Sequence, residues 1–379
     1  MDIKILFLLH LPPPVHGSSV VGFSIKGSKI INKKFNCYYI NLLASHNVSE
    51  SGVVNFKKLL SFLCTWLKTF VLLLRIRPHI CYIALTTTGT AFYRDVLLIA
   101  LLKVFRIKRI YHLHNKGISL HQHKIINQLF YRFVFDNSDV ILLSELLYPD
   151  IQMFVSKSKV HICPNGISRE ASESKIQNFR KTDKNNTNNQ VENSKRPVQI
   201  LFLSNLFESK GVFILLEACK ILMNKEISFE CLFIGEEGDI STLQFNEHVK
   251  QLDLSKYIYY KGRIFGTKKY LAYSEADIIA FPTYKDCFPL VLLEAMSHSL
   301  PVISTFEGGI PDIIENDVNG FLVPQQNSKI LADKLELLIK NPELRIQMGE
   351  IGCKKYKQKF TSEIFENKLS EILLDVYKK

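Results

Sequence analysis

The sequence predicts an α/β protein built from two doubly wound, Rossmann-like domains in series. Short apolar runs alternate with helix-length segments through residues 3–167, and the same alternation starts again at residue 198. This rhythm favours a parallel sheet that is covered by helices on both faces. A chain of 379 residues is long enough for two such domains.

The first domain is expected at residues 1–167 and opens with the apolar run IKILFLLH. This run is short and stops at three prolines, so a buried strand is favoured over a signal peptide. Strands are expected at 3–10, 37–43, 79–85, 109–114, 139–144 and 159–167, with helices at 19–34, 55–76, 90–105 and 122–136. Because Lys68 interrupts the most apolar helix, we expect it to lie in the core or on the surface rather than span a membrane.

Residues 168–197 are rich in Asn, Lys and Ser, which predicts a linker or surface excursion. The second domain is expected at 198–360, and the last helix, within 361–379, is expected to pack back on the first domain. In the second domain, strands are expected at 198–206, 229–238, 258–264, 276–283, 301–309 and 320–323, with helices at 210–224, 240–252, 266–274, 289–298, 310–315, 328–340 and 342–358.

Charge is distributed unevenly along the chain. Residues 1–196 contain 27 Lys+Arg and 11 Asp+Glu, a balance of +16, and the remainder contains 21 and 25, a balance of −4, which together give +12. A basic first half suggests an anionic partner: a nucleic acid, a membrane face or a phosphorylated substrate. The eight cysteines form no CxxC pair, which favours reduced core thiols in a cytosolic protein and no metal site.

Ligands of doubly wound sheets bind at the carboxyl ends of the strands, so functional residues are expected in the loops there. Gly17 precedes a helix after the first strand, where backbone N–H groups can meet an anion, although a proline-stiffened turn explains the same residues. His112 and His114 are expected on one side of their strand, with His114 placed to bond a hydroxyl. Lys210 stands at a predicted helix start, where it can meet a phosphate.

The stretch DCFPLVLLEAM, residues 286–296, places a carboxylate at each end of an apolar run. Pro289 is suited to the first position of a helix, which puts Glu294 in the second turn among apolar neighbours. A buried carboxylate requires a partner. Gly235 and Gly308–Gly309 follow other strands and permit close backbone approach, for instance to a flat base.

Residues 286–323, DCFPLVLLEAMSHSLPVISTFEGGIPDIIENDVNGFLV, resemble the signature region of retaining glycosyltransferase family 4, which has the GT-B fold. The shared pattern is a carboxylate, seven residues and a Glu, then a Pro-Val strand, a Gly-Gly loop and an Asn-Gly-Phe-Leu-Val turn. CPNGI at 163–167 and SKGV at 209–212 fall in the family's order. The resemblance implies two Rossmann-like domains that face each other across a cleft.

The resemblance also implies the roles of individual residues. Glu294 would accept both ribose hydroxyls of a nucleotide-sugar, Asp286 would hold the transferred sugar, His114 would contact it from the first domain, and Lys210 would bind the diphosphate. No cofactor and no metal is implied. The full set is Asp286, His114 and Lys210 as catalytic residues and Glu294, Gly17, Asn205, Gly235, Arg263, Cys287, Phe288, Leu290, Gly308 and Gly309 as donor-binding residues.

The sequence departs from the family pattern at three positions. Asp286 stands where Glu is usual, which shortens the reach by one methylene and bears on the donor sugar. Pro289 stands where a small residue is frequent and donates no N–H. Asn205 stands where many members have an Arg that binds the phosphates together with the Lys. Arg263 or the basic first domain is a candidate to replace that Arg.

We therefore expect a retaining glycosyltransferase that uses a UDP- or GDP-sugar in surface polysaccharide synthesis, such as capsule, O-antigen or exopolysaccharide. Its acceptor is expected to be a glycan or a lipid-diphosphate-linked saccharide. A cytoplasmic protein on the anionic inner face of the membrane fits the basic first half, and nucleic acid is not expected because no base-stacking module or helix-turn-helix segment occurs. A sugar-nucleotide epimerase on the same fold and a non-catalytic nucleotide-binding protein remain the alternatives.

Overall fold

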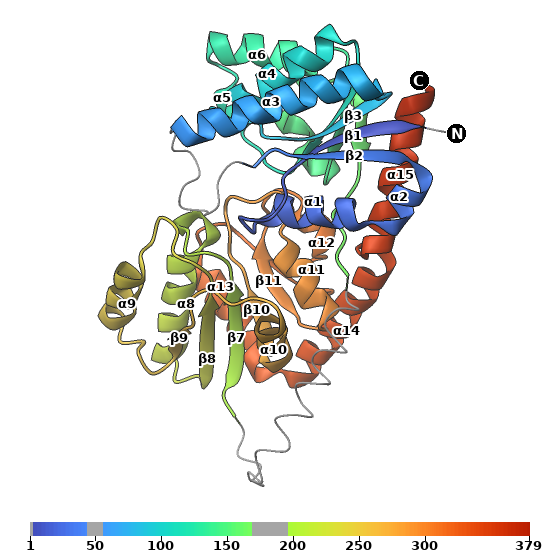
Figure 1. Ribbon diagram of the computed structural model, residues 1–379. Coiled ribbons are helices and arrows are strands. Elements are labelled where there is room, and N and C mark those ends of the chain that lie inside the picture. Colours follow the sequence, from blue (N-terminus) through green and yellow to red (C-terminus); the bar gives the residue numbers. More distant parts are fainter. Residues whose placement is uncertain (1–2, 44–55, 169–195) are drawn as a thin grey trace. The chain divides into compact units, whose positions relative to one another are not determined.

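The computed structural model describes residues 3–43, 56–168 and 196–379, and these divide into two compact units. The first unit comprises Met1–Gly166 and Ser362–Lys379, and the second comprises Ile167–Thr361. Each contains a six-stranded parallel sheet flanked by helices (Figure 1). Two parallel sheets of this kind make the GT-B fold that the sequence predicted. Of the linker expected at 168–197, residues 169–195 lie outside the described residues.

The sheet of the first unit has the strand order β2-β1-β3-β4-β5-β6. Central strand β1 is fully buried from Ile5 to Leu9, which explains its unbroken apolar run. The strands are β1 Lys4–Leu9, β2 Asn36–Asn41, β3 Ile80–Leu85, β4 Lys108–Leu113, β5 Asp139–Leu142 and β6 Val160–Ile162, and the helices are α1 Gly17–Gly27, α2 Lys29–Lys34, α3 Phe56–Ile76, α4 Gly89–Val104, α5 Ile118–His121, α6 Ile125–Phe135 and α15 Ser362–Lys378, with the 3-10 turns η2 Glu145–Asp150 and η3 Lys157–Lys159.

The single helix expected over 19–34 is wrong, because Ser28 divides it into α1 and α2. Ser28 has an extended backbone that ends α1, and its Oγ accepts a hydrogen bond from the Ile31 N–H at 3.1 Å. Serine at this position caps a new helix instead of continuing the old one. The same Oγ donates to the Glu366 carboxylate of α15 at 2.5 Å, so the break also anchors the last helix.

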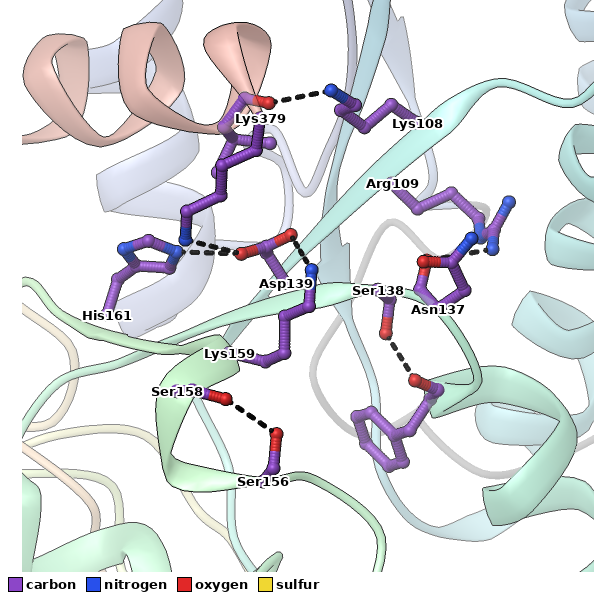
Figure 2. Close-up of polar contacts among 12 residues, drawn as sticks. Lys108, Arg109, Asn137, Ser138, Asp139, Ser156, Ser158, Lys159, His161 and Lys379 are labelled. Atoms are coloured by element: carbon purple, nitrogen blue, oxygen red, sulfur yellow. Dashed lines mark hydrogen bonds and ion pairs between the residues drawn. The ribbon is translucent and has the colours of Figure 1, made fainter.

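Helix α15 packs within the first unit beside α2 (Figure 1). Lys108 Nζ donates to the Val376 carbonyl at 2.9 Å. Figure 2 shows Asp139, at the start of β5, bonded to His161 at 2.9 Å and paired with Lys159 and Lys379 at 3.5 and 3.6 Å. These contacts fix the end of the chain against the sheet of this unit.

The sheet of the second unit has the order β12-β11-β10-β7-β8-β9. The order reverses between β7 and β10, because β8 and β9 follow β7 on one side and the later strands build on the other. The strands are β7 Val198–Leu203, β8 Phe229–Ile234, β9 Ile258–Tyr260, β10 Ile278–Ala280, β11 Val302–Thr305 and β12 Gly320–Val323, and the helices are α8 Val212–Asn224, α9 Thr242–Gln251, α10 Thr267–Glu275, α11 Leu290–Ser297, α12 Ile310–Ile313, α13 Ser328–Lys340 and α14 Pro342–Lys359, with the 3-10 turn η4 Glu208–Lys210.

Candidate functional site

The loops after β7 and β10 meet at the point where the strand order reverses, which is the position where doubly wound sheets bind ligands. Lys210, in the loop after β7, places its Nζ 2.6 Å from Asp286 Oδ2, in the loop after β10. The two side chains are 23% and 17% exposed, so the pair is accessible to a ligand. The topology thus unites two of the predicted site residues, which are 76 positions apart in the chain.

The position of Lys210 differs from the expected helix start. It ends the 3-10 turn η4, and α8 begins two residues later, at Val212. Gly211 between them has φ +83°, and a Cβ there would lie 2.3 Å from the Pro282 carbonyl oxygen. The turn therefore presses the loop after β7 against the loop after β10, which brings Lys210 to Asp286.

Hydrogen bonds within the protein fix the position of Asp286. Its Oδ1 accepts from the Cys287 N–H at 2.8 Å, and its own N–H donates to Glu307 Oε1 at 3.0 Å. Glu307 is 5% exposed and also accepts from Gln325 at 2.8 Å. A buried Glu307 therefore joins the loops after β10 and β11 and fixes the position of Asp286.

The Gly308–Gly309 turn also brings the loops after β10 and β11 together. Gly308 has φ +54°, and a Cβ there would lie 2.4 Å from the Asp286 carbonyl oxygen. The Gly309 N–H donates to the Cys287 carbonyl at 2.7 Å. The N–H groups of Cys287 and Gly309, two of the predicted donor-binding residues, have protein acceptors here. The first turn of α11 leaves the N–H groups of Leu290 and Val291 without intrahelical acceptors.

Helix α11 begins at Leu290, and Pro289 is its N-cap residue rather than its first residue as expected. Glu294 lies in this helix and is 16% exposed. Its Oε1 is 2.6 Å from Lys269 Nζ, and its Oε2 accepts from the Tyr273 hydroxyl at 2.7 Å. Helix α10 therefore supplies two protein partners for this carboxylate, beside the ribose hydroxyls that the resemblance implies.

Lys269 and Tyr273 are four residues apart on α10 and so face the same side. Burial raises the pKa of Tyr273 well above its usual value, and the Glu294 carboxylate raises it further, so the phenol remains a hydrogen-bond donor. Sequence reasoning missed both residues. Their spacing was the available signal, but nothing in the sequence places α10 beside α11.

The remaining predicted donor-binding residues of the second unit serve contacts within the protein. Asn205 Oδ1 accepts from the Glu236 N–H at 3.1 Å. A Cβ on Gly235 would lie 1.9 Å from the Ser204 carbonyl oxygen, so this glycine permits close approach of two protein segments. Arg263 forms an ion pair with Glu236, and its guanidinium lies 4.2 Å from the centre of the Phe265 ring.

Phe288 is buried, and its ring centre is 5.9 Å from that of Phe360. Its buried position places it in the core behind the site. Cys287 is buried as well and reaches the junction through its backbone.

In the first unit, His112 and His114 lie on the same side of β4 as predicted, with ring centres 4.1 Å apart. Burial lowers the pKa of His114 to about 3, with smaller effects from His10 and His16, so the imidazole is neutral near pH 7. Tyr82, which sequence reasoning missed, has its hydroxyl 2.5 Å from His112 Nδ1. A neutral His114 that packs against His112 can donate or accept a hydrogen bond.

Gly17 was expected just before a helix that starts at residue 19, but it is the first residue of α1. The helix is capped by His16, whose Nδ1 accepts from the Ser19 N–H at 3.4 Å. One of the N–H groups expected to meet an anion is therefore satisfied within the turn. Across residues 3–43, 56–168 and 196–379, no cluster of three or more His, Cys, Asp or Glu side chains is arranged to hold a metal ion.

Residues 183–355 match the family described as glycosyl transferases group 1. A segment of 195 residues is 32% identical to an amylovoran biosynthesis glycosyltransferase of Erwinia amylovora, covering 47% of this chain and 45% of that protein. A segment of 179 residues is 28% identical to a capsular polysaccharide biosynthesis glycosyltransferase of Staphylococcus aureus, covering 45% and 44%. The matched segments span less than half the length of these curated relatives.

Solved structures of other proteins resemble the whole chain, and two examples show the extent of the likeness. Sucrose-phosphate synthase of Thermosynechococcus elongatus has a TM-score of 0.75 at 16% identity, with full coverage of both chains. The Anabaena protein HepE, solved with UDP-glucose, has a TM-score of 0.74 at 18% identity, covering 99% of this chain and 100% of its own. At these identities the likeness shows the fold alone. Together with the sequence matches, which cover less than half of this chain, the likeness supports a relationship to glycosyltransferases of the GT-B superfamily.

Proposed function

We propose that this chain, with its GT-B fold and a second unit that matches group 1 glycosyltransferases, transfers a sugar from a nucleotide-sugar with retention of anomeric configuration. The Lys210–Asp286 pair at the reversal of strand order carries the proposal. A cation beside a carboxylate at this position suits a substrate with a diphosphate on one side and sugar hydroxyls on the other.

Each contact of the site has a role in this proposal. When the bond between the anomeric carbon and the diphosphate oxygen breaks, negative charge grows on the departing nucleoside diphosphate. The Lys210 ammonium and the free N–H groups at the start of α11 would stabilise that charge without a metal ion. Asp286 would accept hydrogen bonds from the transferred sugar, and Glu294 from the ribose diol.

The acceptor is proposed to be a glycan or a lipid-diphosphate-linked saccharide of surface polysaccharide synthesis, such as capsule, O-antigen or exopolysaccharide. The names of the matched relatives, which concern amylovoran and capsular polysaccharide, support this class. We place the enzyme in the cytoplasm on the inner face of the membrane, since residues 1–196 have a balance of +16 from 27 basic and 11 acidic residues. UDP-sugars are favoured as donors by the likeness to a protein solved with UDP-glucose.

A thermal-shift screen against UDP, GDP, ADP and their sugars tests donor binding, because a ligand of the folded state raises the melting temperature by mass action. We expect one nucleotide class to stabilise the wild type and to lose this effect in Glu294→Ala. Proton NMR of the product, from the selected donor and an acceptor saccharide with EDTA present, then reports the anomeric configuration. Stabilisation by no nucleotide, or an epimerised nucleotide-sugar as the product, would overturn the proposal.

A further inference from the structure

Helix α3 exposes an apolar row along most of its length. Within Leu59–Ile76, the buried residues of this described helix are Thr69 and Leu73, which make up 11% of the window. Large apolar side chains recur on the opposite side at spacings of three and four, which places them on one face. They are Phe56, Leu59, Leu60, Leu63, Leu67, Val71 and Leu74, and each is 43–73% exposed.

The neighbouring helices α4 and α6 also expose apolar side chains. Helix α4 contacts both α3 and α6, and the three lie next to one another (Figure 1). The Phe70 ring of α3 meets Phe105 at 5.8 Å between ring centres, and Tyr93 of α4 meets Phe130 of α6 at 5.7 Å. The exposed residues are Tyr93, Leu97 and Val104 on α4 and Ile125, Ile126, Leu129 and Phe133 on α6.

We call the exposed rows of α3, α4 and α6 the three-helix face. Soluble monomers rarely expose apolar patches larger than a few hundred Å², and larger ones mark interaction sites. The face therefore requires a partner with apolar character.

The charges on these helices are almost all positive. Their sequences contain seven Lys or Arg residues and a single acidic residue, Asp95. Asp95 is 1% exposed and is paired with Arg94 at 2.7 Å. Lys68 and Arg75, two turns apart on α3, are exposed beside the apolar row. The partner must therefore be negatively charged as well as apolar.

We propose that the three-helix face docks on an anionic lipid bilayer, with α3 lying in the plane of the interface. Its apolar row would enter the acyl-chain boundary, while the Lys68 and Arg75 side chains reach the lipid phosphates. The inference deepens the proposed membrane location, on which it rests, by naming the surface and adding apolar insertion to charge attraction.

The sheet topology argues against α3 spanning the bilayer. The helix connects β2 to β3, and both strands pair with β1 in the same sheet. A single crossing would leave them on opposite sides of the membrane. A second copy of the chain is a poorer partner for this face, because a symmetric dimer would bring two positively charged faces together. Asp95 could not offset that repulsion, since it is already paired with Arg94.

Trp66 allows a direct test, because it is the single tryptophan of the chain and lies on α3, where it stacks on Phe70 at 5.8 Å between ring centres. Vesicles of phosphatidylcholine with phosphatidylglycerol should shift its emission to the blue, and brominated acyl chains should quench it. Pure phosphatidylcholine should do neither to a comparable extent. Binding that leaves Trp66 emission unchanged would overturn apolar insertion.

Sedimentation with the same vesicles tests the residues. We expect Leu63→Glu/Leu67→Glu to weaken binding at least about tenfold, since charged groups are expelled from the acyl region. Leu243→Glu, at a position 69% exposed on α9 of the second unit, is the matched control and should bind like the wild type. If the double variant binds vesicles as tightly as the wild type, or if high salt releases the wild type completely, charge attraction alone explains the binding. Either result would overturn the proposal.

Two further measurements separate this inference from the proposed transferase function. The double variant should retain the thermal shift with the selected nucleotide, which shows that it is folded and competent to bind a donor. Vesicle binding without any nucleotide binding would overturn the transferase and leave the three-helix face standing. A dimer in light scattering that the double variant disrupts, with no vesicle binding by the wild type, would assign the face to a second copy and overturn the lipid proposal.

Discussion

Replacing Glu294 by glutamine tests the ribose assignment most directly, because the structure shows how much of the carboxylate is already in use. A carboxylate offers about four lone-pair sites. Lys269 Nζ lies 2.6 Å from one oxygen and the Tyr273 hydroxyl lies 2.7 Å from the other. One site on each oxygen remains, which matches the two hydroxyls of a ribose diol without displacing either protein partner.

The expected loss of binding free energy in Glu294→Gln follows from the kind of hydrogen bond that is lost. Bonds to a charged acceptor contribute about 1.5–3 kcal/mol each, and an amide keeps one oxygen but loses the charge. We therefore expect Glu294→Gln to weaken nucleotide binding by about 2–3 kcal/mol, or roughly 30- to 150-fold. The effect on folding should be smaller, about 1 kcal/mol, because the Lys269 and Glu294 side chains are both partly exposed.

Calorimetric titration with the selected nucleoside diphosphate and with its 2′,3′-dideoxy analogue completes the test as a double-mutant cycle. The wild type should discriminate against the analogue, and Glu294→Gln should lose most of that discrimination. Glu275→Gln, at an exposed carboxylate on α10, serves as the control and should behave as the wild type. Equal binding of the two ligands by the wild type, or unchanged discrimination by Glu294→Gln, would refute the ribose contact.

Three other outcomes follow from the structure. Gly308→Ala should lower the free energy of unfolding in urea by at least about 2 kcal/mol. Gly262→Ala, also at positive φ but in open space, should lower it by only about 1 kcal/mol. Equal losses would contradict the close contact between Gly308 and the Asp286 carbonyl oxygen. Lys210→Met should weaken nucleoside diphosphate binding about tenfold in calorimetry and leave nucleoside binding unchanged, and a parallel loss of both would contradict a phosphate contact. His10 and His114 have pKa values lowered to about 3, so between about pH 6.5 and 3 the unfolded chain binds more protons than the folded chain. The contribution of each imidazole to the free energy of unfolding should therefore be complete above this range and fall on acidification by up to about 1.4 kcal/mol per pH unit. Urea unfolding from neutral to mildly acid pH should show this slope, and His10→Gln should reduce it; an unchanged slope would contradict a neutral buried imidazole.

The strands could be predicted well because parallel strands buried on both faces leave continuous apolar runs, as Ile5–Leu9 shows. The break at Ser28 could not, since serine fits a helical pattern and its role depends on a cap bond to Ile31. Sequence also placed Lys210 and Asp286 at strand ends. Their contact depends on β7 and β10 being neighbours, which the alternation of elements does not specify.

The glycines show a second limit of sequence reasoning. Gly235 and Gly308 were expected to let a ligand approach the backbone, but both let one protein segment approach another, at Ser204 and at Asp286. The sequence signal is the same in the two cases, because either neighbour requires the absence of a Cβ. Only the tertiary contact decides which neighbour is present.

The most apolar segment of the chain shows why burial is harder to predict than secondary structure. The sequence correctly predicted a helix over 55–76, found as α3 Phe56–Ile76, but left a core and a surface position both open. A doubly wound unit has one layer of helices on each face of its sheet, so the far side of a covering helix is free to be polar. In α3 that side instead carries Leu63, Leu67 and Leu74, each about half exposed. Folding of the unit does not require these side chains, so their presence is best explained by a surface that lies outside the protein.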